Sequence, residues 1–399
     1  MKTINNYTVK NKNILLRVDL NVPVHEGKVA DTSRIKAIKS TLIKLINKKN
    51  KVFLLSHFGR PSGKSNKKYS LEFLQDLICD EVGIKKIYFL KSIKTEEIKS
   101  IQDKMSFGEV CLLENIRFYK EEEANDLDFS KELSKSFDLY VNDAFSASHR
   151  YHASIVNITK FLPSLAGDSL LTEIKNLNIF FNNPEKPNTA IIGGSKISTK
   201  IELLNNLIEY FDNIIIGGAM ANTFLLSKGY NIGNSLVEKK FLDLAKNIIN
   251  KAKDHQCNFI LPIDVVCSNS INDQSNIKKS LIQDVLSDQA IFDIGDKSIQ
   301  IIKDTIIKSK MVLWNGPLGA IEYKPFDYAT KEIANCINQN TNNLNLTSLA
   351  GGGDTISAIW MAKAEKGFTY MSNAGGAFLE WLEGNESPGI ISLRKNKIN

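Results

Sequence analysis

The sequence predicts an α/β protein with two domains, each built on a mainly parallel β-sheet flanked by helices. Its length of 399 residues exceeds the roughly 100–200 residues of an ordinary domain. Short apolar runs alternate with segments of helical period, which is typical of parallel βαβ units. The residues that follow these runs differ between the two halves: they are charged and polar in the first half and glycine-rich in the second.

The apolar runs are the expected strands. In the first half they are residues 14–18, 52–55, 110–113 and 139–141, and in the second half residues 190–192, 214–216, 259–261, 311–314, 346–349 and 368–371. After the first run, apolar residues recur with a helical period up to position 46, which predicts one helix opened by Arg34 with caps among residues 31–33. Another helix is expected to start at Ser70.

Composition narrows the class of protein. With 43% hydrophobic and 24% charged residues, the chain is typical of a soluble globular protein. Its net charge of +7 comes from scattered lysines, so no nucleic-acid-binding arm is expected. Five cysteines without a C-x-x-C motif indicate free thiols in a reducing compartment. We find no signal-peptide pattern and no apolar run of the ~18 residues that a membrane span needs, so we expect a cytoplasmic protein without a membrane partner.

Cations and hydrogen-bonding side chains follow the strands of the first half. Ligands bind beyond the carboxyl ends of the strands in an open parallel sheet, so these side chains are expected to meet at one edge. Arginine forks match phosphate and carboxylate groups bidentately, which predicts an anion pocket. Its candidate residues are Asp19, Asn21, Arg34, His57, Arg60, Arg117 and Arg150.

Glycines follow the strands of the second half. The five loops contain Gly193-Gly194, Gly217-Gly218, Asn315-Gly316-Pro317, Gly351-Gly352-Gly353-Asp354-Thr355 and Asn373-Ala374-Gly375-Gly376. Glycine at a strand–helix junction lets the backbone approach phosphates, and the helix N-terminus adds N–H donors and a positive dipole. Five such loops in one half predict a nucleotide site, and the two halves together predict transfer of a phosphoryl group.

Single side chains complete the expected nucleotide site, although each alone would also fit an ordinary surface residue. Lys196 and Lys200 are four residues apart, which would place both on one face of a helix leaving the Gly193-Gly194 turn. Asp354 follows three glycines, and a carboxylate beside phosphates is how Mg²⁺ is usually held. Glu322 lies just beyond the 315–319 loop and is a candidate acceptor for a ribose hydroxyl.

Six motifs closely resemble those of the phosphoglycerate kinase family. They are Arg17-Val-Asp19-Leu-Asn21-Val-Pro23, Ser56-His57-Phe-Gly59-Arg60-Pro61, Leu113-Glu-Asn-Ile-Arg117-Phe118, Gly193-Gly-Ser-Lys196 with Lys200, Trp314-Asn-Gly-Pro317 and Gly351-Gly-Gly-Asp354-Thr355. The resemblance continues to residues 379–384 and so covers essentially the whole chain. It implies the glycolytic reaction, which is reversible transfer between 1,3-bisphosphoglycerate and ADP to give 3-phosphoglycerate and ATP with Mg²⁺.

The resemblance also implies a domain plan. Two Rossmann-like domains, residues 1–165 and 183–384, would be joined by a hinge helix at 166–182. The tail, about 385–399, would pack back on the first domain. Because each domain would carry one ligand, closure about the hinge is expected to bring the ligands together and exclude water. The resemblance suggests a monomer.

Residue roles follow from the same match. Asp19, Asn21, Arg34, His57, Arg60, Arg117 and Arg150 would hold the triose, and Arg34 and Lys196 would be the catalytic cations at the moving phosphoryl group. The nucleotide residues would be Gly193, Gly194, Lys196, Lys200, Gly217, Gly218, Asn315, Pro317, Glu322, Gly352, Gly353, Asp354 and Thr355, with Asp354 as the Mg²⁺ ligand.

One departure concerns the loop after the last expected strand. The family's usual Ser-Thr-Gly-Gly-Gly-Ala is replaced by Ser372-Asn-Ala374-Gly375-Gly-Ala377. A Cβ at position 374 restricts positive φ and close approach of the backbone, so an effect on nucleotide affinity and rate is expected.

Two alternative functions stay open at this point. A kinase for another acyl or carboxylate substrate would keep the glycine-rich half and change the first pocket, although the first pocket holds more cations than a lone carboxylate needs. A non-catalytic protein that binds nucleotide or nucleic acid would fit the basic charge. The sequence contains no clustered basic stripe with interleaved aromatic residues to support it.

Overall fold

The computed structural model describes residues 1–182, 184–272 and 276–396. The chain divides into two compact units, of which the first comprises Met1–Lys175 and the C-terminal segment from Glu386, and the second comprises Asn176–Asn385. The division falls within helix α8 (Asp168–Asn178). Within the described residues, we find no helix that combines the length and the apolar character required to cross a membrane.

The first unit is built on a six-stranded sheet in which every pair of neighbours is parallel. The order is β5-β6-β4-β1-β7-β8, with bounds β1 Asn13–Arg17, β4 Lys51–Leu55, β5 Tyr88–Leu90, β6 Val110–Leu113, β7 Leu139–Asn142 and β8 Ser164–Ala166. All four expected strands are confirmed. The edge strands β5 and β8 were missed because three residues are too few to show a strand period. A small hairpin, β2 (Val24–His25) with β3 (Lys28–Val29), lies outside this sheet.

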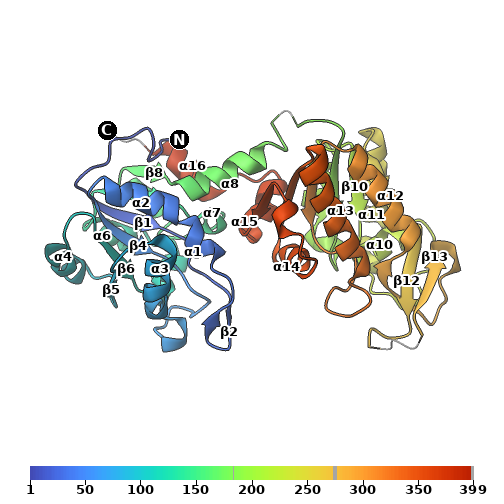
Figure 1. Ribbon diagram of the computed structural model, residues 1–399, viewed down its shortest axis with the longest axis horizontal. Coiled ribbons are helices and arrows are strands. Elements are labelled where there is room, and N and C mark those ends of the chain that lie inside the picture. Colours follow the sequence, from blue (N-terminus) through green and yellow to red (C-terminus); the bar gives the residue numbers. More distant parts are fainter. Residues whose placement is uncertain (183, 273–275, 397–399) are drawn as a thin grey trace. The chain divides into compact units, whose positions relative to one another are not determined.

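One face of this sheet is covered by α1 (Ser33–Ala37), α2 (Lys39–Asn47) and α3 (Gln75–Val82) (Figure 1). Side chains alternate across a strand, so Ile14, Leu16 and Val18 join the apolar core with these helices. Leu15 and Arg17 therefore point to the opposite face. There, Phe53 of β4 packs against Phe137, with ring centroids 5.3 Å apart.

Two helix expectations need correction. The helix expected up to position 46 is divided into α1 and α2 at Ile38, which belongs to neither helix although its φ of −76° and ψ of −13° stay in the right-handed helical region. The helix expected from Ser70 begins as a 3₁₀ turn, Glu72–Leu74, and α3 starts only at Gln75. The carboxylate of Glu114 accepts hydrogen bonds from Ser70 Oγ (2.7 Å) and Leu71 N (2.9 Å), which holds this stretch outside the helix.

The remaining helices of the first unit are α4 (Thr95–Lys104), α5 (Lys120–Glu123), α6 (Leu127–Ser134), α7 (Phe145–Ser148) and α16 (Pro388–Lys395). The C-terminal α16, red in Figure 1, packs on α7 and β8 of this unit. Beyond it, Asn396 Nδ2 donates to the carbonyl oxygens of Thr159 (2.6 Å) and Leu162 (3.0 Å). The last three residues of the expected tail, 397–399, lie outside the described residues.

The second unit contains a second six-stranded parallel sheet. Its strands are β9 Asn188–Ile192, β10 Asn213–Ile216, β11 Asn258–Ile260, β15 Met311–Asn315, β16 Thr347–Gly351 and β17 Tyr370–Ser372. In chain order the sheet reads 3-2-1-4-5-6, the Rossmann arrangement. The six expected strands and the fold class are confirmed.

The helices of the second unit are α9 (Ile201–Leu207), α10 (Met220–Ser227), α11 (Leu242–Asp254), α12 (Asp296–Lys308), α13 (Tyr328–Leu344), α14 (Gly353–Met361) and α15 (Gly376–Leu382). Buried residues of β9 and β15, including Ile191 and Trp314, share a core with α12 and α13. α10 packs against α11.

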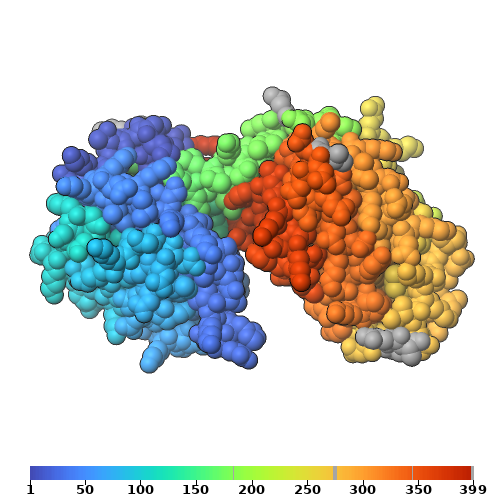
Figure 2. All heavy atoms as spheres, viewed as in Figure 1, coloured from blue at the N-terminus to red at the C-terminus, as the bar shows by residue number. Residues whose placement is uncertain are grey.

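A three-stranded antiparallel sheet was not expected. It has the order β13-β12-β14, with bounds β12 Asp264–Ser268, β13 Lys278–Leu281 and β14 Ala290–Ile294. Its yellow residues gather at one end of the second unit (Figure 2). Strand β13 reads Lys-Lys-Ser-Leu, which lacks the apolar run that marks a strand. Val265 and Ile282 of this region pack with Leu225 of α10.

Candidate active site

Each parallel sheet has a point at which its strand order reverses, and ligands of open α/β sheets bind at such points. In the first unit the reversal lies at β1, between β4 and β7, and in the second at β9 and β15. The loops that leave these strands carry most of the expected site residues. The topology therefore brings together residues that are 127 positions apart in sequence, such as Asp19 and Ser146, whose Oγ donates to Asp19 Oδ2.

In the first unit, hydrogen bonds join the loops that follow β1 and β4. Leu20 N donates to Ser56 Oγ (2.9 Å), and Gly59 N donates to Asn21 Oδ1 (2.9 Å). Asp19 binds Arg34 Nη1 at 2.6 Å. Burial would raise the pKa of Asp19, but Arg34 and hydrogen bonds from Ser146 and Asn21 outweigh it and bring this pKa to about 2. Asp19 is thus a permanent anion that orients Arg34.

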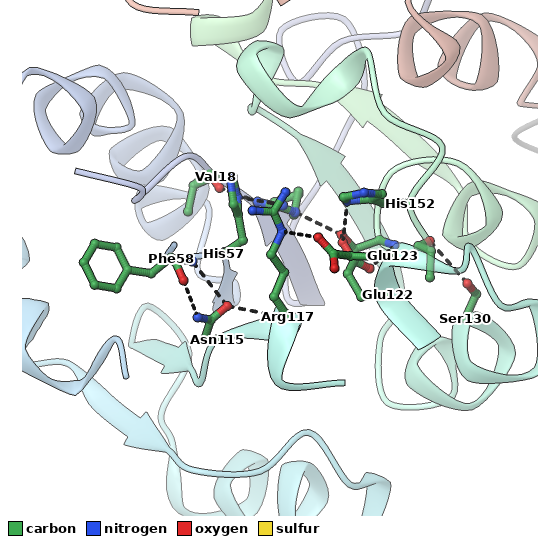
Figure 3. A network of polar contacts seen from close by, with 12 residues as sticks. Val18, His57, Phe58, Asn115, Arg117, Glu122, Glu123, Ser130 and His152 are labelled. Carbon is green, nitrogen blue, oxygen red and sulfur yellow. Dashed lines mark hydrogen bonds and ion pairs between the residues drawn. The ribbon is translucent and has the colours of Figure 1, made fainter. Parts of the chain in front are cut away.

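Arg117 is the centre of positive charge in this unit. Its Nη1 donates to the carbonyl oxygen of Gly59 (2.8 Å), and its Nε lies 3.2 Å from Glu123 Oε1 (Figure 3). Its Nη2 is buried and has no hydrogen-bond partner among the described residues. Burial and the neighbouring guanidiniums of Arg150 and Arg17 lower the pKa of Arg117 to about 10. A buried guanidinium nitrogen of this kind is suited to binding an anion.

Arginine is rare in this chain and concentrated here. The sequence has six arginines, and Arg17, Arg34, Arg60, Arg117 and Arg150 belong to β1, α1 or the loops at this sheet edge. Lysine supplies most of the other positive charge. Because the guanidinium fork binds phosphate and carboxylate bidentately whereas lysine acts as a point charge, this distribution indicates a shaped anion site. Arg60 is exposed and Arg150 half-buried.

Three residues of this region were missed as site residues. Arg17, Glu122 and Ser154 are buried beneath the loops and connected by hydrogen bonds. The available signal was Arg17, a charged residue inside the apolar run 14–18. Glu122 and Ser154 gave no signal, because only the folded chain shows that they lie beside Arg17.

In the second unit, main-chain hydrogen bonds hold the glycine loops together. Gly193 N donates to Asn315 O (2.9 Å), Gly194 N to Pro317 O (3.2 Å) and Gly218 N to Leu318 O (2.8 Å). A Cβ on Gly193 would lie 2.0 Å from Pro317 O, and one on Gly218 would lie 2.5 Å from Gly194 O. Glycine is therefore required here for contact between backbones.

These bonds change the expected role of the glycines. The N–H groups of Gly193, Gly194, Gly217 and Gly218 are all donated to carbonyl oxygens of the protein, so they are not the donors for phosphate. The first turn of α14, with Gly353 and Asp354, has N–H groups without intrahelical acceptors, as every helix N-terminus does. Among the expected glycine residues, those at the start of α14 therefore keep the N–H groups that are suited to an anion. Thr355 Oγ1 of this helix accepts from Gly316 N (2.6 Å).

The expected placement of Lys196 and Lys200 on one helix face is wrong. Lys196 is extended (φ −133°, ψ 127°), a 3₁₀ turn covers Ile197–Thr199, and α9 starts after Lys200. Glu238 accepts from Ser198 N (3.0 Å) and Ser198 Oγ (2.7 Å). These side-chain bonds compete with helix formation and keep Lys196 exposed in an extended segment.

Lys200 is directed into the glycine loops. Its Nζ donates to Asn315 Oδ1, and Asn315 Nδ2 donates to Gly351 O (2.7 Å). Burial lowers the pKa of Lys200 to about 8, although Glu383 and Asp354 act in the opposite direction. Lys200, Asn315 and the start of α14 therefore form one connected group.

A cavity of about 340 Å³ opens beside this group. Gly194, Gly218, Pro317, Glu322 and Asp354 are expected site residues that line it. Its other wall is apolar and comprises Leu225, Leu236, Val265, Ile271, Ile291 and Phe292. This wall was missed, because its residues look like ordinary apolar residues in sequence, and three of them, Val265, Ile291 and Phe292, belong to strands β12 and β14 of the unexpected sheet.

The strained φ expected at Ala374 does not arise. Ala374 is not among the residues with positive φ, and the left-handed conformation in this loop belongs to Gly375 (φ 54°). Ala374 N donates to Ser372 Oγ (3.2 Å). The Cβ at position 374 therefore causes no backbone strain.

Comparisons with known proteins agree with this geometry. The family model described as phosphoglycerate kinase matches residues 4–385. The phosphoglycerate kinase of Chelativorans sp. (strain BNC1) is 43% identical over 387 residues, covering 97% of each chain, and that of Finegoldia magna is 44% identical over 395 residues, covering 98% of each. The solved structure of phosphoglycerate kinase from Coxiella burnetii has a TM-score of 0.89 at 34% identity and covers 99% of both chains.

The packing of the glycine loops makes a prediction about two alanine substitutions. Gly193→Ala should lower the melting temperature of the second unit, because its Cβ meets fixed backbone and overpacking costs about 1–3 kcal/mol. Gly353→Ala is the control, since its Cβ meets nothing within 4 Å and should change stability by less than about 1 kcal/mol.

Near-ultraviolet circular dichroism measures this difference, because all three tryptophans, Trp314, Trp360 and Trp381, lie in the second unit. Equal melting temperatures for the two variants would contradict the close packing of Gly193 on Pro317.

Proposed function

The chain belongs to the phosphoglycerate kinase family, and from this premise we propose how its residues carry out the reaction. The protein is a glycolytic kinase that transfers a phosphoryl group reversibly between 1,3-bisphosphoglycerate with ADP and 3-phosphoglycerate with ATP. The alternatives, a kinase for another acyl or carboxylate substrate and a non-catalytic binding protein, are disfavoured by this membership. We assign the triose to the first unit and the nucleotide to the second.

The observation that carries the triose assignment is the excess of positive charge around Arg117, which its ion pair with Glu123 offsets only in part. Its buried Nη2 has no partner among the described residues, and the guanidiniums of Arg150 and Arg17 lower its pKa. A substrate that carries a phosphate and a carboxylate relieves this repulsion and suits several guanidinium forks. Asp19, Asn21, His57 and Arg60 complete the proposed contacts.

The nucleotide assignment is supported by the two walls of the cavity. The apolar wall with Leu225, Leu236 and Val265 suits a flat adenine base, and the start of α14 suits phosphate groups. Lys196 and Lys200 supply positive charge, and Glu322 is exposed at the cavity as the proposed ribose acceptor.

Asp354 fits a role as Mg²⁺ ligand. It is exposed at the cavity in the first turn of α14, and no cluster of three or more His, Cys, Asp or Glu side chains suited to a metal occurs in the described part of the chain. One carboxylate with phosphate oxygens and water is the usual way in which proteins hold Mg²⁺ beside a nucleotide. When bound, Mg²⁺ neutralises charge on the phosphate oxygens.

Catalysis on this account needs no nucleophilic side chain. An acyl phosphate is already activated, so the protein aligns the two ligands and stabilises charge on the transferring oxygens. Arg34, oriented by Asp19, acts from the triose side, and the exposed Lys196 acts from the nucleotide side. Glu238, through its two bonds to Ser198, restricts the segment that carries Lys196.

We further propose that the protein acts as a monomer in the cytoplasm. Each ligand site is formed by residues of one chain, so neither requires a second copy. The five cysteines are free thiols, and burial raises the pKa of Cys111 to about 12. Unreactive free thiols suit a reducing compartment.

The catalytic roles are tested in a coupled assay with 3-phosphoglycerate, ATP and Mg²⁺. Arg34→Ala and Lys196→Ala should each lower kcat by roughly 10³–10⁵, as for comparable cations in phosphoryl transfer. Lys36→Ala is the control for Arg34, because Lys36 lies on the same helix with its side chain 62% exposed, and it should retain full activity.

If a substitution lowers kcat by less than about tenfold, the catalytic role assigned to that residue is wrong. Glycerate is the substrate control: the phosphate is needed to satisfy the arginines, so wild-type protein that phosphorylates glycerate as well as 3-phosphoglycerate would contradict the triose assignment.

The lowered pKa of Lys200 predicts a pH effect on nucleotide use. Lys200 is protonated at pH 7 and loses its charge above pH 8, so kcat/KM for MgATP, which reports groups of the free enzyme, should fall by about tenfold per pH unit above that point. In Lys200→Arg the guanidinium stays charged over the whole pH range, so kcat/KM should not fall above pH 8. The same alkaline fall in both proteins would show that another group is responsible.

Transfer also requires the two ligands to meet, and they are assigned to different units. We propose that α8, which contains the end of the first unit at Lys175, acts as the hinge. Small-angle scattering should show a smaller radius of gyration with both substrates bound than with neither. An unchanged radius would count against closure.

A further inference from the structure

We propose that Glu122, Ser154 and Arg17 form a buried relay that positions His57 as a hydrogen-bond donor with its ring proton on Nε2. None of the three relay residues would touch the substrate, so they are positioning residues. The relay itself is read from contacts within the first unit. Only its consequence for triose binding rests on the proposed function.

Arg17 is the centre of the relay. It is the last residue of β1, only 1% exposed, and points to the face opposite α1 and α2. Its guanidinium makes three hydrogen bonds: Nη1 to Val18 O (2.6 Å), Nε to Ser154 Oγ (3.0 Å) and Nη2 to His57 Nδ1 (3.3 Å). Three partners around a planar group fix its orientation completely.

Glu122 supplies the opposite charge. It is fully buried, and its Oε1 and Oε2 accept from Ser154 Oγ (2.6 Å) and Ser154 N (2.8 Å). The Ser154 hydroxyl thus donates its one hydrogen to Glu122 and accepts from Arg17. A buried guanidinium is tolerated when a counter-charge and hydrogen bonds accompany it, and Ser154 connects the two charges.

His152 does not disturb this arrangement. Its Nδ1 lies 3.6 Å from Glu122 Oε1 (Figure 3), but burial and the nearby Arg117 and Arg17 lower the pKa of His152 to about 3. It is therefore neutral at working pH and does not replace Arg17 as the partner of Glu122.

The relay determines which ring nitrogen of His57 carries the proton. A guanidinium has donors and no acceptor, so Nδ1 of His57 must be the acceptor in its contact with Arg17. The proton of the neutral ring then lies on Nε2. Within the described part of the chain Nε2 has no hydrogen-bond partner, and His57 is 7% exposed, so this N–H is available to a ligand.

The charges around His57 keep it neutral. Burial and Arg17 hold its pKa well below the usual 6.5; Arg117 and Arg150 act in the same direction, and Asp19 opposes them. A second proton would have to sit on Nδ1, facing the Arg17 guanidinium. His57 therefore presents one N–H of constant charge to an anionic substrate, while the arginines supply the positive charge.

The test substitutes the connecting hydroxyl and observes the ring of His57. In wild-type protein, ¹⁵N NMR of labelled histidine should show protonated Nε2 and unprotonated Nδ1, unchanged from pH 5.5 to 8. Ser154→Ala removes one of the three bonds that orient Arg17. It should produce a mixture of His57 tautomers, and KM for 3-phosphoglycerate should rise roughly fivefold to tenfold, as for loss of one net hydrogen bond, with kcat nearly unchanged.

Ser130→Ala is the matched control. Ser130, labelled in Figure 3, is also fully buried, and its one hydroxyl hydrogen has two carbonyl oxygens within reach, those of Asp126 (2.8 Å) and Ala153 (3.2 Å). The Ser130→Ala variant lacks a hydroxyl in the same region that does not contact Arg17, so the His57 signals and the KM should stay unchanged. If Ser154→Ala does not fold, Glu122→Gln takes its place, because it keeps the shape of the side chain and removes the charge that Ser154 connects to Arg17. It should also produce a mixture of His57 tautomers.

The possible results distinguish a failure of the relay from a failure of the proposed function. A wild-type His57 protonated on Nδ1, or variants with wild-type His57 signals, would overturn the relay. A wild-type ring with the expected tautomer that does not respond to added 3-phosphoglycerate would leave the relay intact and refute the triose contact of His57.

Discussion

Parallel pairing of the strands is the constraint on which the rest of this structure depends. It directs the carboxyl ends of neighbouring strands to one edge, so the loops after β1, β4, β6 and β7 converge although they are far apart in sequence. In the second unit the same constraint stacks the loops after β9, β10 and β15 so closely that a Cβ at Gly193 has no room. The topology of the sheets therefore determines where both candidate sites lie, and the side chains on the loops determine what each site can bind.

The two units solve the problem of holding anions in different ways. The first uses arginines, and it neutralises their mutual repulsion with buried or half-buried acids: Asp19 beside Arg34, and Glu122 behind Arg17. The second uses little buried charge and relies on backbone, a helix N-terminus and Lys200. This division fits a small substrate with two charged groups on one side and a nucleotide with an apolar base on the other.

The two sheets and the candidate site residues could be predicted from the sequence, because the patterns that mark them are local. An apolar run of four or five residues marks a central strand, and the residue after it marks the sheet edge. The sequence-based prediction was wrong where the local structure depends on contacts between segments that are distant in sequence. Glu238 holds Ser198 and keeps Lys196 out of a helix, Glu114 binds Ser70 and delays α3, and Glu122 reaches Arg17 through Ser154. None of these carboxylates is distinguishable in sequence from a surface acid. The short strand β13 was missed because its lysines interrupt any apolar run, and only its pairing with β12 makes it a strand.

The scarcity of arginine allows the anion site of the first unit to be tested directly. With six arginines in the chain, the Nε–H groups of ¹⁵N-labelled protein give a simple NMR spectrum that can be followed as 3-phosphoglycerate is added. The signals of Arg34, Arg117 and Arg150 should shift. The signal of Arg394, which lies on the C-terminal helix and pairs with Glu386, should not. Binding of 3-phosphoglycerate that leaves the first three signals unmoved would contradict this site.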